Sequence, residues 1–201
     1  MKKLALAVAL MGFMGSASAT GLTFDSSQYT NPDITFGAYD STILTGAVSS
    51  GSFGRLLADV AGTITFTYIG EESGFKNRFA LVIDGPNLVL NETGTPGVTS
   101  VSSFIDAGLV KFRFIDTSTN PNTVFNNGQI SEPTLGFALL DVTGALPGEF
   151  FFGFNDSFTG DADYDDIVVK ATFSAVPVPA ALPLMATALG LFGFGASRRR
   201  V

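Results

Sequence analysis

The sequence predicts an all-β fold, a single antiparallel β-sandwich of jelly-roll type between an N-terminal signal peptide and a C-terminal hydrophobic helix. Many short apolar segments are bounded by Gly, Pro, Asn and Asp, several alternate apolar with polar residues, and none has the periodicity of an amphipathic helix. The composition agrees, because 23 Gly and 20 Phe with only 14% charged residues are typical of β-rich globular proteins. We expect three parts: residues 1–19, 20–175 and 176–201.

The first part, residues 1–19, is interpreted as a secretory signal peptide. Lys2 and Lys3 give a positive start, an apolar stretch follows, and Ala17-Ser18-Ala19 is a small-residue cleavage site. The sequence therefore predicts export, with Thr20 as the first residue of the mature chain. A buried amphipathic helix is the alternative interpretation.

The central part is expected to consist of short strands and turns. Apolar and polar residues alternate, as in half-buried strands, at residues 63–68, 110–114 and 167–173. Continuous apolar runs lie between turn signals at residues 79–83, 135–140 and 150–154. Loops are expected at residues 93–103 and 117–123. No internal repeat of fixed period is found, so one domain is expected.

Missing residue types exclude several classes of function. The chain has no His and no Cys, which removes Ser-His-Asp and Cys-His catalysis, zinc sites with imidazole or thiolate ligands, and disulfides. Five of the eleven basic residues lie in the two end segments, so six basic residues face eighteen acidic ones in the central part. Such a surface repels phosphate backbones, so we expect no nucleic-acid partner, whereas cations are suitable partners.

The densest group of chemically active side chains precedes the last expected strand. Five carboxylates occur within eleven residues, and no basic residue is nearer than Lys170. They are Asp156, Asp161, Asp163, Asp165 and Asp166. Hard oxygen ligands without nitrogen or sulfur suit Ca²⁺, and the spacing does not match an EF-hand. We therefore expect a calcium site here, with a solvated acidic turn as the alternative.

This acidic segment and an earlier turn resemble one bacterial protein family. Residues 160–168 are similar to the closing Gly-Asp-x-Asp-[Tyr/Phe]-[Asn/Asp]-Asp-hydrophobic signature of an extracellular domain family of unknown function. Residues 70–77 are similar to a Gly-x-Glu-[Ala/Ser]-Gly-[Tyr/Phe]-x-Asn box in the same proteins. The resemblance implies a secreted β-domain with a cation site. Glu72 is a candidate ligand from the earlier turn, and the alternative for Glu72 is an exposed turn residue.

The C-terminal part combines a proline motif, an apolar segment and a basic end. Val176-Pro177-Val178-Pro179 is expected to be extended, because proline fixes φ and disfavours helix at the preceding residue. Residues 180–196 carry no charge and would span about 25 Å as a helix, a short transmembrane length. The positive-inside rule places the basic residues on the cytoplasmic side. They are Arg198, Arg199 and Arg200.

This order of motifs resembles the PEP-CTERM sorting tail of Gram-negative bacteria, in the variant that begins Val-Pro-Leu-Pro-Ala. The resemblance covers residues 176–201. It implies recognition by an exosortase in the inner membrane, removal of the helix near the proline motif, and delivery to the cell surface or the extracellular matrix. A permanent single-span anchor is the alternative.

We expect a non-catalytic exported protein with a structural, adhesive or exopolysaccharide-associated role. A carbohydrate-binding module is one alternative. A carboxylate-based glycoside hydrolase is another, although the chain has no Trp as a platform for sugar stacking. No residue is assigned a catalytic role.

Overall fold

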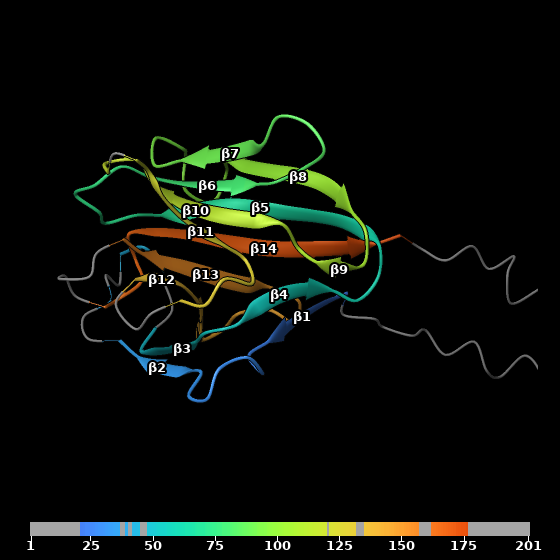
Figure 1. Ribbon diagram of the computed structural model, residues 1–201, viewed down its shortest axis with the longest axis horizontal. Coiled ribbons are helices and arrows are strands. Elements are labelled where there is room, and N and C mark those ends of the chain that lie inside the picture. Colours follow the sequence, from blue (N-terminus) through green and yellow to red (C-terminus); the bar gives the residue numbers. More distant parts are fainter. Residues whose placement is uncertain are drawn as a thin grey trace, which may run out of the picture.

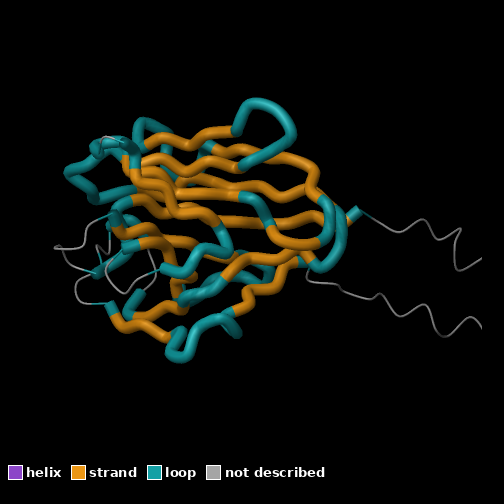
Figure 2. Tube along the Cα trace, in the orientation of Figure 1, coloured by secondary structure: helices purple, strands orange, loops and turns teal. Residues whose placement is uncertain are grey.

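The computed structural model describes residues 21–36, 39, 42–44, 48–119, 121–131, 135–156 and 162–176. Within these residues the chain forms strands β1 to β14 and no helix (Figures 1 and 2). The strands belong to three sheets, and all pairings between the described strands are antiparallel, as between β5 and β14. The prediction of an all-β, antiparallel fold is confirmed. The predicted signal peptide and C-terminal helix lie outside the described residues.

The largest sheet has seven strands. Their order across the sheet is β2 (Asp33–Thr35), β3 (Ser50–Ser52), β12 (Gly136–Leu140), β13 (Phe150–Asn155), β14 (Ile167–Ala175), β5 (Gly62–Gly70) and β8 (Ser100–Ile105). β5 and β14 are the longest strands, with nine residues each. At about 3.3 Å per residue they extend for roughly 30 Å, so this pair spans the length of the sheet.

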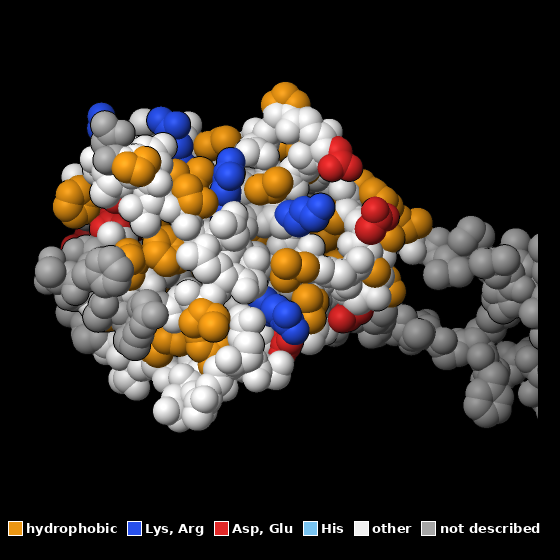
Figure 3. All heavy atoms as spheres, in the orientation of Figure 1, with side chains coloured by type: hydrophobic (Ala, Val, Ile, Leu, Met, Phe, Trp, Pro, Cys, Tyr) orange, Lys and Arg blue, Asp and Glu red, His pale blue; other side chains and the backbone are white. Residues whose placement is uncertain are grey.

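Two smaller sheets complete the fold. One contains β11 (Thr123–Asn126), β10 (Phe112–Asp116), β6 (Asn77–Leu81) and β7 (Leu88–Asn91). The other contains β1 (Leu22–Asp25), β4 (Arg55–Ala58) and β9 (Gly108–Leu109). On the face of the molecule seen in Figure 3, Lys and Arg side chains are scattered and do not form a continuous basic patch.

The main core lies between the seven-stranded sheet and the two smaller sheets. It is built on phenylalanine: the Phe66 and Phe79 rings, from β5 and β6, are 4.5 Å apart, and those of Phe114 and Phe154, from β10 and β13, stack at 5.2 Å. All four side chains are fully buried. Burying one such ring contributes roughly 1.5–3 kcal/mol, so these pairs fix how the layers face each other.

A second core lies on the opposite face of the seven-stranded sheet. Phe36 and Phe53, from the segment between β1 and β4, cover Leu140, Val168 and Tyr164 there. As a result the first half of β14 is buried on both faces, whereas the alternation in the sequence predicts only one buried face. This second core covers only part of the outer face, and it ends near Lys170.

The described chain begins and ends at the same end of the molecule, on the right in Figure 1. The backbone N–H of Asp59 donates to the Gly21 carbonyl at 3.0 Å, and that of Val176 donates to the Ala61 carbonyl at 3.2 Å. The opposite ends of β5 and β14 lead to Glu72 and Asp165. The terminal residues and these two carboxylates therefore lie at opposite ends of the longest strand pair.

Six strands lie where the alternating and apolar segments predict them, namely β5, β6, β10, β12, β13 and β14. The expected loop at residues 93–103 is wrong in part, because β8 begins at Ser100. β8 is rich in serine and lies at the edge of its sheet, where it pairs with β5 among the described strands, so it lacks the apolar alternation of a central strand. The loop at 117–123 also ends in strand, since β11 begins at Thr123. No helix of the described residues is long and apolar enough to cross a membrane.

Candidate metal site

Two segments far apart in the sequence meet beyond the ends of β5 and β14. The pairing of these strands reaches Gly70 and Val168. It is continued by a hydrogen bond from the Glu72 N–H to the Asp165 carbonyl, at 3.2 Å. The turn after β5 therefore lies directly beside the segment that enters β14.

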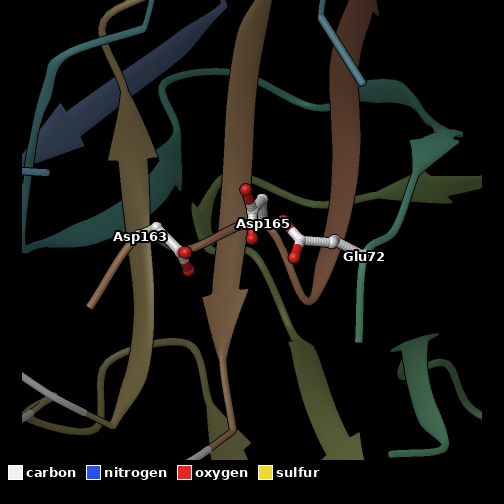
Figure 4. Close-up of side chains that lie close together, drawn as sticks. All are labelled: Glu72, Asp163 and Asp165. Carbon is white, nitrogen blue, oxygen red and sulfur yellow. The ribbon is translucent and has the colours of Figure 1, made fainter. Parts of the chain in front are cut away.

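Three carboxylates converge at this junction, those of Glu72, Asp163 and Asp165 (Figure 4). One oxygen atom from each lies within 4.8 Å of one from each of the others. Asp163 and Asp165 are each only 2% exposed, whereas Glu72 is exposed. Three negative charges at this distance repel one another, and burial of two of them adds a desolvation cost, unless a cation or protons neutralise them.

The backbone of Tyr164 holds the two buried aspartates in place. Tyr164 has φ of 63°, a left-handed conformation that non-glycine residues rarely adopt. Its ring lies 5.5 Å from that of Phe36 and 5.9 Å from that of Phe53, in the second core. Its carbonyl oxygen sits so close to Gly153 on β13 that a Cβ there would be only 1.9 Å away. An aromatic anchor and a glycine contact thus fix the segment between Asp163 and Asp165.

Asp156, Asp166 and Glu92 belong to a separate hydrogen-bonded network beside this group. Asp156 Oδ2 accepts hydrogen bonds from Ser73 Oγ at 2.9 Å and from Asn77 Nδ2 at 2.6 Å. Asp166 Oδ2 accepts one from the Asp156 N–H at 2.7 Å. Glu92 accepts one from the Asn77 N–H. These carboxylates are held by protein donors and do not join the group of three.

Burial raises the pKa values of two carboxyl groups in this network. It raises the pKa of Asp166 to about 7, and the nearby charge of Asp156 acts in the same direction. Burial also raises the pKa of Glu92 above its ordinary value, although the hydrogen bond from the Asn77 N–H lowers it. Both shifts have burial as their main cause, because burial penalises the charged form of a carboxyl group.

The structure thus separates the residues that the sequence groups together. Of the predicted ligands, Glu72, Asp163 and Asp165 share one centre, Asp156 and Asp166 contact each other beside it, and Asp161 lies outside the described residues. Sequence reasoning did not single out Asn77 and Glu92 as members of the neighbouring network. Asn77 is the last residue of the Gly-x-Glu-Ser-Gly-Phe-x-Asn box, which is the signal that would have indicated it.

The sorting motif is described at its first residue only. The Val176 N–H donates to the Ala61 carbonyl, which extends the pairing of β14 with β5 beyond Ala175 and Gly62. The other residues of the motif, Pro177, Val178, Pro179, Arg198, Arg199 and Arg200, lie outside the described residues.

The acidic group does not line a large groove that the described residues form. That groove has a volume of about 610 Å³ and lies near the ends of β8 and β9; Ile83, Phe104 and Lys111 are among the residues that line it. Glu72, Asp163 and Asp165 are not among them. A carboxylate pair that hydrolyses glycosides must flank a cleft that admits the sugar chain, and the described acidic group has no such relation to this groove.

Comparison with known proteins gives no relative: no family model, no curated protein and no solved structure matches this chain.

Proposed function

We propose that this protein is an exported, non-catalytic surface or matrix protein with a jelly-roll-like sandwich, and that Glu72, Asp163 and Asp165 bind a stabilising Ca²⁺ ion. The observation that supports the ion site is the convergence of three carboxylate oxygens within 4.8 Å, two of them from residues only 2% exposed. An all-oxygen set suits Ca²⁺, which takes six to eight oxygen ligands, so backbone and water oxygens would complete the shell.

Calcium would change the sign of the interaction at this junction. Without a cation the three carboxylates oppose the pairing of the Glu72 turn with the Asp165 segment. With a divalent cation the same charges hold the two segments together. Since the ion binds the folded chain, it stabilises that state by RT ln(1 + [L]/Kd), about 2.7 kcal/mol at a concentration a hundred times Kd.

Thermal unfolding of the full chain in a nonionic polyoxyethylene detergent tests this proposal. We expect the Tm to be higher in millimolar Ca²⁺ than in chelator, because extracellular calcium sites often bind at roughly 0.1–1 mM. The double variant Asp163→Asn, Asp165→Asn should lose the calcium shift and melt in chelator at the same or a higher temperature than the unmodified chain. Equal melting of the unmodified chain in both conditions would favour the solvated acidic turn.

A matched variant separates the ion site from a general effect of charge. Asp84→Asn with Asp106→Asn removes the same two charges, and neither aspartate belongs to the acidic group. This variant should keep the full calcium shift. Loss of the shift in both double variants would show that calcium acts on the overall negative charge and not at the proposed site.

The route of export is the second part of the proposal. The signal peptide and the tail of residues 176–201 favour an inner-membrane intermediate, processing by an exosortase-type enzyme, and a final place on the cell surface or in the matrix of a Gram-negative bacterium. Intact-mass measurement of the protein recovered from cells and medium tests this. We expect masses that correspond to loss of residues 1–19 and of the C-terminal apolar segment. A mass that retains the tail would favour a permanent anchor.

A further inference from the structure

The outer face of β8, β5 and β14 carries a regular grid of hydroxyl groups. The strand pairing aligns residues of these three strands in rows, from β8 through β5 to β14. The rows are Phe104, Thr63 and Ser174; Ser102, Thr65 and Thr172; and Ser100, Thr67 and Lys170. Seven of these nine side chains are serine or threonine. In the middle row, Thr65 Oγ1 and Ser102 Oγ are 2.7 Å apart and hydrogen-bonded.

This grid is open, unlike the rest of the same face. The second core covers the sheet at Leu140, Phe151 and Val168. Beyond Lys170 all the grid positions are exposed or half-buried, and Phe104 is 57% exposed. The side chains on the opposite face of these strands, such as Ile64 and Phe66, fill the main core. The hydroxyl groups are therefore presented to solvent on a rigid, well-packed support.

The grid is also electrically neutral within a strongly acidic protein. Its only charged residue is Lys170, whose Nζ lies 2.7 Å from Glu149 Oε1 and 5.9 Å from the centre of the Phe151 ring. The ion pair compensates the lysine charge. The grid therefore offers neutral donors and acceptors and one apolar ring, that of Phe104. It has no net charge to attract or repel an ionic partner.

We propose that this hydroxyl grid binds an extended, uncharged polysaccharide. Neighbouring groups within a row are about 4.8 Å apart, the distance between strands, and successive rows are about 6.7 Å apart along the strands, so the hydroxyls form a repeating array. Each hydroxyl both donates and accepts, which suits the hydroxyl groups of a sugar chain. The exposed Phe104 ring at one corner provides an apolar surface for the C–H face of a sugar ring.

A second copy of the chain fits this face less well. The grid measures about 10 by 13 Å from its strand spacings, whereas a stable protein interface buries about 800 Å² on each partner. The centre of such an interface is apolar and often aromatic, but the centre of the grid is Thr65. The inference rests on the proposed function only for the extracellular location, because the grid and the acidic group share no residue.

Pull-down with insoluble neutral polysaccharides tests the inference. The probes are cellulose, curdlan and starch granules, and the full chain is kept in a polyoxyethylene detergent, which contains no sugar. We expect the chain to bind at least one of these solids, equally in Ca²⁺ and in chelator. Absence of binding to all three overturns the inference. If the chain binds one of these polysaccharides but its Tm is the same in Ca²⁺ and in chelator, only the proposed ion site is overturned.

Variants that lack hydroxyl groups of the grid test whether this face binds the polysaccharide. The triple variant Thr63→Val, Thr65→Val, Thr67→Val keeps β-branched side chains, so it should retain the strand while losing the central hydroxyls. We expect at least a tenfold loss of affinity for the bound solid. A second variant, Ser100→Ala with Ser102→Ala on the edge strand, serves if the triple variant fails to fold.

Two controls make the result specific. Thr35→Val with Thr93→Val removes exposed threonine hydroxyls elsewhere in the chain and should leave binding unchanged. Unchanged binding by both grid variants overturns the inference. Concentration-dependent dimerisation that disappears in the grid variants, measured by analytical ultracentrifugation, also overturns it, because the face would then be an interface between two copies.

Discussion

Tyr164 shows how one residue can position a site without belonging to it. Its left-handed backbone lies between Asp163 and Asp165 in the chain, and its ring is buried against Phe36 and Phe53. A positive φ is costly for a residue with a bulky side chain. Burial of the aromatic ring compensates that cost, and the carbonyl of the same residue occupies the space above Gly153.

Gly153→Ala should therefore destabilise the protein and disturb the acidic group. The added Cβ would lie 1.9 Å from the Tyr164 carbonyl oxygen, so the segment must shift. We expect a loss of about 1–3 kcal/mol in the free energy of unfolding, as for other overpacked core positions, measured by urea denaturation in chelator. The calcium shift in Tm should also decrease.

Gly74→Ala is the matched control for this substitution. No heavy atom lies within 4 Å of the position of its Cβ, and its φ is not positive. The free energy of unfolding should change little, or increase slightly because alanine restricts the unfolded chain. If Gly153→Ala and Gly74→Ala give equal stabilities, the contact with Tyr164 has no energetic role.

At the scale of elements, alternation in the sequence is a good guide where one face of a strand is buried and the other is solvated. β5 follows this pattern from Gly62 to Gly70. β8 does not, because its serines leave only Val101 and Ile105 to indicate the buried face. The burial of both faces of β14 near Val168 is a tertiary effect, since the covering residues come from the segment before β4.

Residue spacing likewise predicts only part of the candidate site. Asp163 and Asp165 are two residues apart in a segment next to a strand, so the sequence places them in one acidic cluster. Asp166, the next residue, accepts a hydrogen bond from the backbone of Asp156, a contact that residue spacing does not indicate. The positive φ of Tyr164 and the pairing that brings Glu72 to Asp165 depend on long-range packing. Sequence spacing alone does not encode either of them.

The ion pair between Lys170 on β14 and Glu149, just before β13, makes the stability of the fold depend on pH. The hydrogen bond from Lys170 is the main cause that lowers the pKa of Glu149 below its ordinary value of 4.5, and a hydrogen bond from the Leu146 N–H adds to it. A carboxyl group with a lowered pKa in the folded state stabilises the fold at pH values above 4.5. That contribution is lost as the pH falls through the lowered value.

Glu149→Gln should therefore reduce the free energy of unfolding at neutral pH by about 0.2–1 kcal/mol, the usual range for a solvent-accessible pair. The difference from the unmodified chain should shrink as the pH is lowered below 4.5. Urea denaturation across this pH range in chelator measures it. A difference for Glu149→Gln that is independent of pH would indicate a packing effect instead.

At the scale of the whole molecule, the long strand pair separates the chain ends from the acidic group. Gly21 and Val176 lie near the start of β5, whereas Glu72 and Asp165 lie beyond its end. The nine residues of β5 correspond to roughly 30 Å. A body attached through residue 176 would thus hold the proposed cation site away from the point of attachment, with the hydroxyl grid along its side.

Luminescence energy transfer from a bound Tb³⁺ ion measures the distance between the acidic group and residue 176. Tb³⁺ can replace Ca²⁺ in this test because it is another hard cation that takes oxygen ligands. The chain contains no Cys, so a single introduced cysteine labels only one position with an acceptor dye. Phe75→Cys and Val176→Cys are matched in exposure, at 52% and 51%. A dye at position 75, three residues from Glu72, should quench Tb³⁺ strongly. A dye at position 176, roughly 30 Å away along β14, should quench it much less. Equal transfer to both dyes would contradict the placement of the ion at this end of the strands. Loss of both signals in the variant Asp163→Asn, Asp165→Asn would show that the signal comes from the acidic group.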